Sequence, residues 1–145
     1  MKNIFIKYFN YNLTELKNIN GKNSNWIDLR ASQRVELKKG EFKLIPLGVA
    51  MILPKGYEAI IAPRSSTFKN YGILQSNGVG VIDQSFQGDG DEWMMGVYAT
   101  RDTVIEENDR ICQFRIFKNQ PKINFTKLFH FGTKNRGGFG STGVK

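Results

Sequence analysis

The stretch from residue 77 to residue 88 (NGVGVIDQSFQG) constrains the fold more than any other part of the chain. Glycine alternates with valine over residues 78–81, so one edge of the segment carries almost no side chain and leaves backbone N–H and C=O groups accessible. We interpret the stretch as a hairpin, with Asp83 at a strand terminus and the ring of Phe86 three residues later. Such a segment can read a planar heterocycle, and the alternative is an ordinary Gly-rich turn with a surface Asp.

The composition predicts one soluble domain rich in strands and turns. The chain has 145 residues, 40% of them hydrophobic, and 15 glycines. This length is typical of a single domain, and that glycine content favours turns and strands over helices. With one cysteine, Cys112, and one histidine, His130, a single chain holds no internal disulfide, no metal site built from histidines and no Ser-His-Asp triad.

The absence of long apolar runs predicts a protein of the cytosol. No run approaches about 18 apolar residues, and the apolar core of the first residues is too short for a signal peptide. The net charge of +8 attracts polyanions, which include nucleic acid, an acidic partner and a small phosphorylated substrate. Because the basic residues are spread along the chain without a recognition helix or zinc finger, we expect no stable nucleic-acid binding and no membrane association.

Four further segments carry candidate chemistry. In the first, residues 26–32 form a short strand pattern in which Asp28 lies between apolar neighbours, so its carboxylate is satisfied either by backbone donors or by a nearby cation. In the second, a strand over residues 57–62 stops at Pro63, and the hydroxyl cluster that follows resembles a helix N-cap. The short helix then ends at Gly72, and its first residues are either a phosphate site or a plain surface cap.

The third segment, residues 107–116, is a turn into a strict alternation. This alternation places Cys112, Phe114 and Ile116 on one face of a strand, and Gln113 and Arg115 on the other. Cys112 has no histidine or second cysteine near it in the sequence, so we interpret it as a small core residue and not as a nucleophile.

The fourth segment is the glycine-rich C-terminus, residues 135–145. Its glycines expose backbone N–H groups, and Arg136, Ser141 and Thr142 are donors suited to phosphate. Phe139 is an aromatic residue that belongs to no predicted strand or helix. The segment is either a flexible arm or a lid that becomes ordered over a bound ligand, and we favour the lid.

These five segments resemble, in order, the five sequence motifs of the homotrimeric dUTPase family, and together they span nearly the whole chain. The matching residues are 26–31 (WIDLRA), 63–66 (PRSS), 77–88, 108–113 (NDRICQ) and 136–143 (RGGFGSTG).

The resemblance implies an all-β, distorted jelly-roll-like β-barrel with one short helix, assembled as a homotrimer. A flexible C-terminal arm, approximately residues 133–145, is expected to close the active site of another subunit. The implied reaction converts dUTP and water into dUMP and pyrophosphate, which limits uracil incorporation into DNA.

The resemblance also assigns roles to individual residues. Asp83 would activate the water that attacks the α-phosphorus, and Phe86 would lie under the deoxyribose. Mg²⁺ would be held by the three phosphates with no direct protein ligand, and Asp28 would reach it through water. The residues implied in substrate binding are Arg64, Ser65, Ser66, Asn77, Gly80, Val81, Ile82, Phe86, Gln113, Arg136, Phe139, Gly140, Ser141 and Thr142.

The sequence departs from the usual family pattern in three places. The sugar platform is Phe86 where Tyr is usual, and the first motif has Trp26 and Ile27 where Ala-Gly is typical. The last motif is two residues shorter between Arg136 and Phe139. These changes are typical of a subgroup.

Two alternatives accompany this interpretation. A dCTP deaminase has a similar fold but uses Glu where Asp83 stands. The other alternative is a regulatory protein of the same fold, whose main task would be to bind a protein partner in a nucleotide-dependent way. The expected location is the cytoplasm, or the host cytoplasm if a virus encodes the protein.

Overall fold

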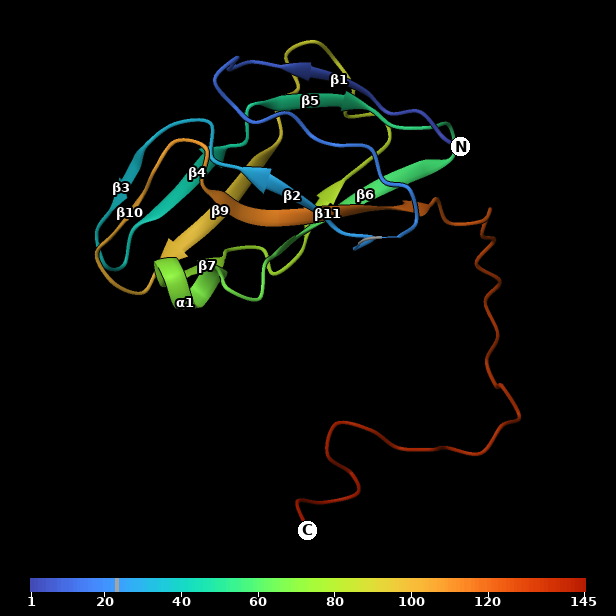
Figure 1. Cartoon of the computed structure of the whole chain (residues 1–145). Coiled ribbons are helices and arrows are strands. Elements are labelled where there is room, and N and C mark those ends of the chain that lie inside the picture. The colour runs from blue at the N-terminus through green and yellow to red at the C-terminus, as the bar shows by residue number, and fades with distance from the viewer. Residues whose placement is uncertain (23) are drawn as a thin grey trace.

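The computed structural model describes residues 1–22 and 24–145, and it consists of short antiparallel strands with one short helix (Figure 1). The elements in chain order are β1 (Phe5–Tyr8), β2 (Ile27–Arg30), β3 (Val35–Leu37), β4 (Phe42–Pro46), β5 (Val49–Ile52), β6 (Tyr57–Pro63), α1 (Thr67–Tyr71), β7 (Ile73–Gln75), β8 (Gly80–Ile82), β9 (Met94–Ala99), β10 (Thr103–Ile105) and β11 (Arg110–Lys118). The predicted all-β class with one short helix is confirmed.

Hydrogen bonding divides the strands into four sheets. The largest has the strand order β2-β11-β6-β8, the next has the order β4-β9-β7, and the pairs β1-β5 and β10-β3 complete the set. Within the described part of the chain these sheets do not close into one continuous barrel. The fold is therefore an open arrangement of sheets around a shared core.

The core lies between the two larger sheets, where alternate residues of each strand point inward. Phe114 of β11 and Trp93 are both buried, and their rings meet edge to face with centroids 5.2 Å apart. Ile61 of β6 and Met95 of β9 belong to the same cluster. Aromatic and aliphatic packing thus holds the sheets together, with single backbone hydrogen bonds such as that from the Ser32 N–H to the Pro46 carbonyl oxygen.

The short helix and its end agree with the sequence. α1 begins after Ser66 and ends where Gly72 adopts a left-handed conformation with φ 63°. The positive φ favours glycine there, and a Cβ would also lie 2.5 Å from Nε of Arg101, so the arginine side chain would have to move. Ser66 is the N-cap by position, but its side chain makes no capping hydrogen bond.

The hairpin prediction for residues 77–88 is wrong. β7 pairs with β9 in the three-stranded sheet, whereas β8 pairs with β6 in the four-stranded sheet. The turn at Asn77 and Gly78 therefore carries the chain from one sheet to the other. The alternation of small and apolar residues marked a strand correctly, but periodicity does not name the partner of a strand.

Candidate active site

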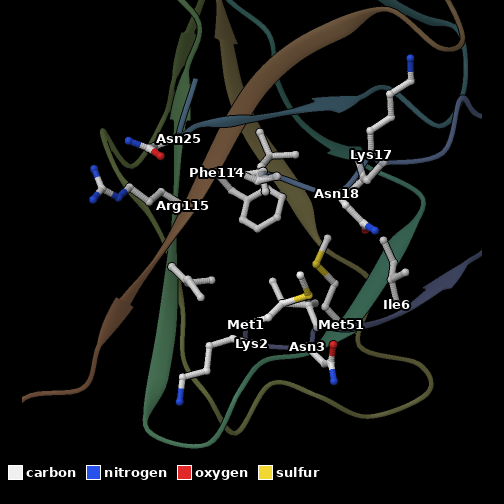
Figure 2. Close-up of a pocket in the computed structure, with 15 residues that line it drawn as sticks. Met1, Lys2, Asn3, Ile6, Lys17, Asn18, Asn25, Met51, Phe114 and Arg115 are labelled. Atoms are coloured by element: carbon white, nitrogen blue, oxygen red, sulfur yellow. The ribbon is translucent and has the colours of Figure 1, made fainter. Parts of the chain in front are cut away.

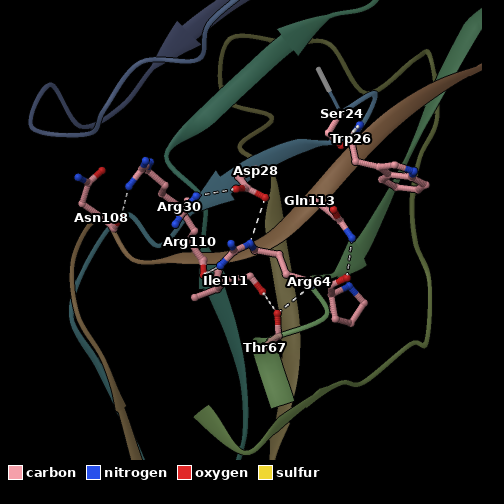
Figure 3. Close-up of polar contacts among 11 residues, drawn as sticks. Ser24, Trp26, Asp28, Arg30, Arg64, Thr67, Asn108, Arg110, Ile111 and Gln113 are labelled. Atoms are coloured by element: carbon pink, nitrogen blue, oxygen red, sulfur yellow. Dashed lines mark hydrogen bonds and ion pairs between the residues drawn. The ribbon is translucent and has the colours of Figure 1, made fainter. Parts of the chain in front are cut away.

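Two arginines converge on one carboxylate at the end of the four-stranded sheet (Figure 3). Nε of Arg64 lies 3.1 Å from Oδ1 of Asp28, and Nη1 of Arg110 lies 3.2 Å from Oδ2 of the same side chain. Of the two interpretations of Asp28, the cation is therefore the one realised. Two guanidinium groups share one carboxylate, so this arginine–aspartate cluster, formed by Asp28, Arg64 and Arg110, keeps an excess positive charge that suits an anion.

A buried threonine fixes the start of the segment that carries Arg64. Oγ1 of Thr67 accepts a hydrogen bond from the backbone N–H of Arg64 at 2.8 Å and donates to the carbonyl oxygen of Ile111 at 2.9 Å. The side chain is 1% exposed. Thr67 thereby joins the turn after β6 to the start of β11, so that Arg64 and Arg110 lie side by side.

The predicted phosphate-binding residues of the second and fourth motifs lie around this cluster. Gln113 of β11 is in register with Asp28 of β2, and its Nε2 donates to the carbonyl oxygen of Pro63 at 3.0 Å. Ser65 is exposed and Ser66 is partly buried, and the helix does not use the Ser66 hydroxyl as a cap. The structure brings all of these residues to one end of the sheet.

The alternation predicted for β11 is confirmed. Cys112 and Phe114 are buried, Gln113 and Ile116 are partly buried, and Arg115 is exposed. Burial raises the pKa of the Cys112 thiol, so the thiol stays protonated at neutral pH. Cys112 is a core residue, as the sequence indicated.

A tyrosine at the end of α1 lies near the two arginines. Burial, with a further contribution from Asp109, raises the pKa of Tyr71 to about 12, although the charges of Arg64 and Arg110 act in the opposite direction. The phenol therefore remains neutral and keeps its proton.

The glycine-containing strand β8 lies at an edge of the four-stranded sheet, next to β6. Gly80 is in register with Ile61, and Ile82 is in register with Ala59. Val81 is exposed, Ile82 is buried, and Asn77 is exposed in the turn that leads into the strand. Because β8 has a strand on one side only, its other edge offers backbone groups to a partner, as the sequence predicted.

The carboxylate of Asp83 is exposed just after β8 and is held by its neighbour Ser85. The backbone N–H of Ser85 donates to Oδ2 of Asp83 at 2.8 Å, and the Ser85 hydroxyl donates to the same oxygen. These hydrogen bonds, that of the hydroxyl first, lower the pKa of Asp83. Phe86 follows within the same turn and is 38% exposed.

One chain does not bring Asp83 and the arginine–aspartate cluster together. β8 runs antiparallel to β6, so Asp83 continues past Ala59 at one end of β6, whereas Arg64 follows Pro63 at the other end. Four residues of extended strand, about 13 Å, separate Ala59 from Pro63 alone. Asp28 lies on the opposite edge strand of the same sheet.

The C-terminal segment extends away from the sheets as a chain without strands or helices after β11 (Figure 1). Arg136, Ser141 and Thr142 are exposed there, as are Gly140 and the ring of Phe139. This segment contacts neither the cluster nor β8 in one chain.

Comparisons with known proteins give the chain a family. The model of the dUTPase family matches residues 15–143. The chain is also 52% identical over 142 residues to the SPbeta prophage-derived deoxyuridine 5'-triphosphate nucleotidohydrolase of Bacillus subtilis (strain 168), covering 98% of this chain and 99% of that protein. This chain belongs to the dUTPase family. A more distant relative, the deoxyuridine 5'-triphosphate nucleotidohydrolase of Rickettsia akari, is 37% identical over 77% of this chain and 76% of its own length.

Solved structures of dUTPases share the fold. The dUTPase of Staphylococcus bacteriophage 80alpha, as a point mutant with dUpNHpp, superposes with a TM-score of 0.79 at 19% identity and covers 99% of this chain and 100% of that one. The dUTPase of Streptococcus mutans superposes with a TM-score of 0.69 at 20% identity and covers 82% of this chain and 98% of that one. The expected jelly-roll-like fold is that of these dUTPase neighbours.

The predicted site residues of this dUTPase lie outside the cavity beside β1. A cavity of about 520 Å³ lies between β1, β2 and β11, with Met51 and Phe114 among its walls (Figure 2). Ile27 and Phe114 line it, whereas their neighbours Asp28 and Gln113 do not. Phe114, Arg115 and Ile116 of β11 all line this cavity, and no residue of the arginine–aspartate cluster does, so the cavity is separate from that cluster.

Sequence reasoning on this dUTPase missed Thr67 and Arg110 as members of the site. Arg110 lies within the fourth motif and opens β11, so its place beside Asp28 follows only once β2 is known to pair with β11. Thr67 follows the two serines, and its burial is not visible in the sequence.

No helix of the described residues is long and apolar enough to cross a membrane.

Proposed function

We propose that this dUTPase cleaves dUTP to dUMP and pyrophosphate in sites shared between the subunits of a homotrimer. The 52% identity to a dUTP nucleotidohydrolase over nearly the whole chain supports the assignment of this reaction. The distance between Asp83 and Arg64 supports the shared site, because a base and a phosphate-binding cluster at opposite ends of β6 must come from different copies to meet one nucleotide. The dCTP deaminase alternative is not favoured, since the family has been identified and the acid is Asp83.

The arginine–aspartate cluster would bind the phosphate chain. Arg64 is oriented by Asp28 and by the Arg110 carbonyl oxygen, which its Nη1 approaches at 3.3 Å. The hydroxyls of Ser65 and Ser66 and the amide of Gln113 would supply neutral donors around it. A charged guanidinium held in place before substrate arrives stabilises charge without reorganisation.

The free edge of β8 would read the base. The backbone of residues 80–82 would hydrogen-bond the uracil edge, with Asn77 supporting the turn before it. Cytosine presents a donor where uracil has its O4 acceptor, so fixed backbone groups would leave buried polar atoms unpaired and reject it. Phe86 would lie under the deoxyribose and exclude a 2′-hydroxyl.

Asp83 would act as the general base. The lowered pKa keeps the carboxylate ionised throughout the neutral range, which is the form that accepts a proton from water, although the same shift makes it a weaker base. Its Oδ2 is occupied by Ser85, which leaves Oδ1 to bind the attacking water. The water would then attack the α-phosphorus, and pyrophosphate would leave from the opposite side.

Magnesium would enter with the nucleotide. Both oxygens of Asp28 bind arginine, so this carboxylate fits a contact through water and not direct coordination. The structure of a neighbour, a mutant dUTPase from phage phi11 of S. aureus, reveals the coordination of a structural Mg(II) ion. Bound Mg²⁺ would neutralise phosphate charge and fix the conformation of the triphosphate.

The C-terminal arm, residues 133–145, would close a site on another subunit. All 13 acidic residues lie at or before Asp109, so the negative charges of the chain are confined to its first 109 residues. After that point the charged residues are all basic: Arg110, Arg115, Lys118, Lys122, Lys127, Lys134, Arg136 and Lys145. A basic segment carrying exposed Phe139 suits a lid that meets both a triphosphate and a base. Arg136, Ser141 and Thr142 would bind the γ-phosphate end, while Phe139 and Gly140 cover the base.

A regulatory partner is a secondary proposal. Phage dUTPases, among them the structural neighbour from Staphylococcus bacteriophage 80alpha, control transfer of virulence genes by a proto-oncogenic G protein-like mechanism. A nucleotide-dependent partner of this chain would be found by a pull-down with and without dUpNHpp. A cytoplasmic location, in a host cell if the source is viral, is a further secondary proposal.

The function is tested by pyrophosphate release from dUTP, dCTP, dTTP and UTP in parallel, with magnesium and then with a chelator. We expect release from dUTP alone, and a strong decrease with the chelator. Equal rates with dCTP would contradict base reading by β8, and equal rates with UTP would contradict the sugar platform. Binding of dUTP without hydrolysis would move the regulatory alternative to first place.

A further inference from the structure

Gln75 is a buried amide that joins the two larger sheets. It ends β7 in the three-stranded sheet, where its backbone is in register with Val97 of β9. Its side-chain Nε2 nevertheless donates to the carbonyl oxygen of Ile61 in β6, 3.1 Å away in the four-stranded sheet. The residue is 9% exposed, so this hydrogen bond lies away from water.

The Gln75 amide also lies directly behind Gly80. Ile61, whose carbonyl oxygen it binds, is the register partner of Gly80. A Cβ added to Gly80 would lie 2.9 Å from Nε2 of Gln75 and 3.0 Å from Cβ of Ile61. The strand β8 therefore rests on the Gln75 amide at the position where it carries no side chain of its own.

One half of the same amide has no partner. Oε1 of Gln75 is buried and accepts no hydrogen bond from the described residues. Packing alone would be served better at this position by an apolar side chain of similar volume, such as Met, which buries no polar atom. The amide is thus explained by the hydrogen bond that Nε2 makes and by the backbone that this bond fixes.

We propose that Gln75 is a positioning residue for base recognition, which holds the Gly80 backbone at the spacing that uracil requires. The inference rests on the proposed function, in which residues 80–82 hydrogen-bond the base. Gln75 acts through Gly80 and Ile61 and is not itself a catalytic residue. Backbone donors and acceptors discriminate between bases only when their positions are fixed, because a misplacement of about 1 Å weakens such contacts severely.

The test compares Gln75→Met with the wild-type protein by calorimetric binding of dUpNHpp and by steady-state kinetics with dUTP and dCTP. We expect Kd and KM for the uracil nucleotides to rise by about ten-fold, kcat to change by less than about two-fold, and the preference for dUTP over dCTP to fall. A lower melting temperature with unchanged KM and unchanged preference would overturn the inference, since that is the result of a structural role alone.

Gln75→Glu gives an independent measurement if the Met variant folds poorly. A protonated carboxyl donates to the Ile61 carbonyl oxygen as the amide does, whereas a carboxylate repels it. The KM of this variant should therefore fall toward the wild-type value as the pH is lowered, and a KM ratio that does not change with pH would contradict the positioning role.

Val97→Ala is the matched control, because Val97 is the buried register partner of Gln75 and contacts the core on the same strand pair. It should lower the melting temperature and leave KM and base preference unchanged. If the wild-type protein binds no dUpNHpp at all, the proposed function fails and this inference fails with it. If the wild type binds and Gln75→Met binds equally well, only the role of Gln75 is overturned.

Discussion

Nε of Arg64 lies 3.1 Å from Oδ1 of Asp28, although the two residues are 36 positions apart in the sequence. This contact holds the arginine in place, and the second oxygen of Asp28 holds Arg110 in the same way. The carboxylate therefore joins the two arginines of the proposed phosphate site.

Removing the carboxylate should release both arginines. For Asp28→Asn we expect KM for dUTP to rise by about ten-fold, since the arginines lose their fixed geometry, and stability to fall by no more than about 1 kcal/mol, because the pair is partly exposed to solvent. Steady-state kinetics and urea denaturation measure both effects. Glu36→Gln is the control, because it breaks an exposed pair with Arg34 and should change neither value measurably.

The general base should be essential for turnover and dispensable for binding. Asp83→Asn preserves the shape of the side chain but does not accept a proton, so we expect kcat to fall by about 10²- to 10⁴-fold with Kd for dUpNHpp nearly unchanged. Single-turnover kinetics and calorimetry make this comparison. Near-normal turnover would show that another group activates the water.

Shared sites predict that two inactive variants complement each other. Arg64→Ala and Asp83→Asn each disable every site in their own homotrimers, but a mixed trimer contains sites that take both intact residues from different subunits. Co-expression with two affinity tags should therefore recover a clear fraction of wild-type activity. No recovery from purified mixed trimers would place both residues in the site of one chain.

Ser85 should control the ionisation of Asp83. The hydroxyl of Ser85 is the main cause of the lowered pKa of Asp83, so Ser85→Ala should raise that pKa toward its ordinary value. A carboxyl group whose pKa is lower in the folded state stabilises the fold at pH values above its ordinary pKa. This contribution disappears as the pH falls through the folded-state pKa. Ser85→Ala should therefore also lose this small contribution to folding stability at neutral pH. Carboxyl titration by NMR in both proteins measures the shift, and an unchanged Asp83 pKa would contradict the assignment.

Thr67 should matter for stability and for the placement of Arg64 together. Thr67→Val leaves the Arg64 N–H and the Ile111 carbonyl oxygen without their partner, which costs about 1–3 kcal/mol for buried groups. Chemical denaturation measures the loss. Thr67→Ser retains the hydroxyl and should recover most of it, whereas equal losses in both variants would point to packing of the methyl group.

The sequence predicted several of the elements, among them the strand over residues 57–62 and the helix that ends at Gly72, and several of the local environments. The alternation over residues 112–116 placed Cys112 and Phe114 inside because neighbouring strand residues point to opposite faces, and Gly72 ended the helix because it adopts a left-handed conformation. The resemblance of five ordered motifs identified the family before any coordinate. These features depend on residue type and on spacing along the chain, which a sequence states directly.

The partners of each strand and of each buried polar group were decided only by the tertiary structure. Residues 77–88 have the pattern of a hairpin, yet β7 and β8 belong to different sheets, because the core formed with Trp93 and Phe114 determines which edges meet. For the same reason the sequence left Asp28 between two environments and gave no sign that Thr67 or Gln75 would be buried. The sequence determined which strands form and which family they build, and long-range packing alone decided which side chains meet, since a contact over tens of residues leaves no local pattern.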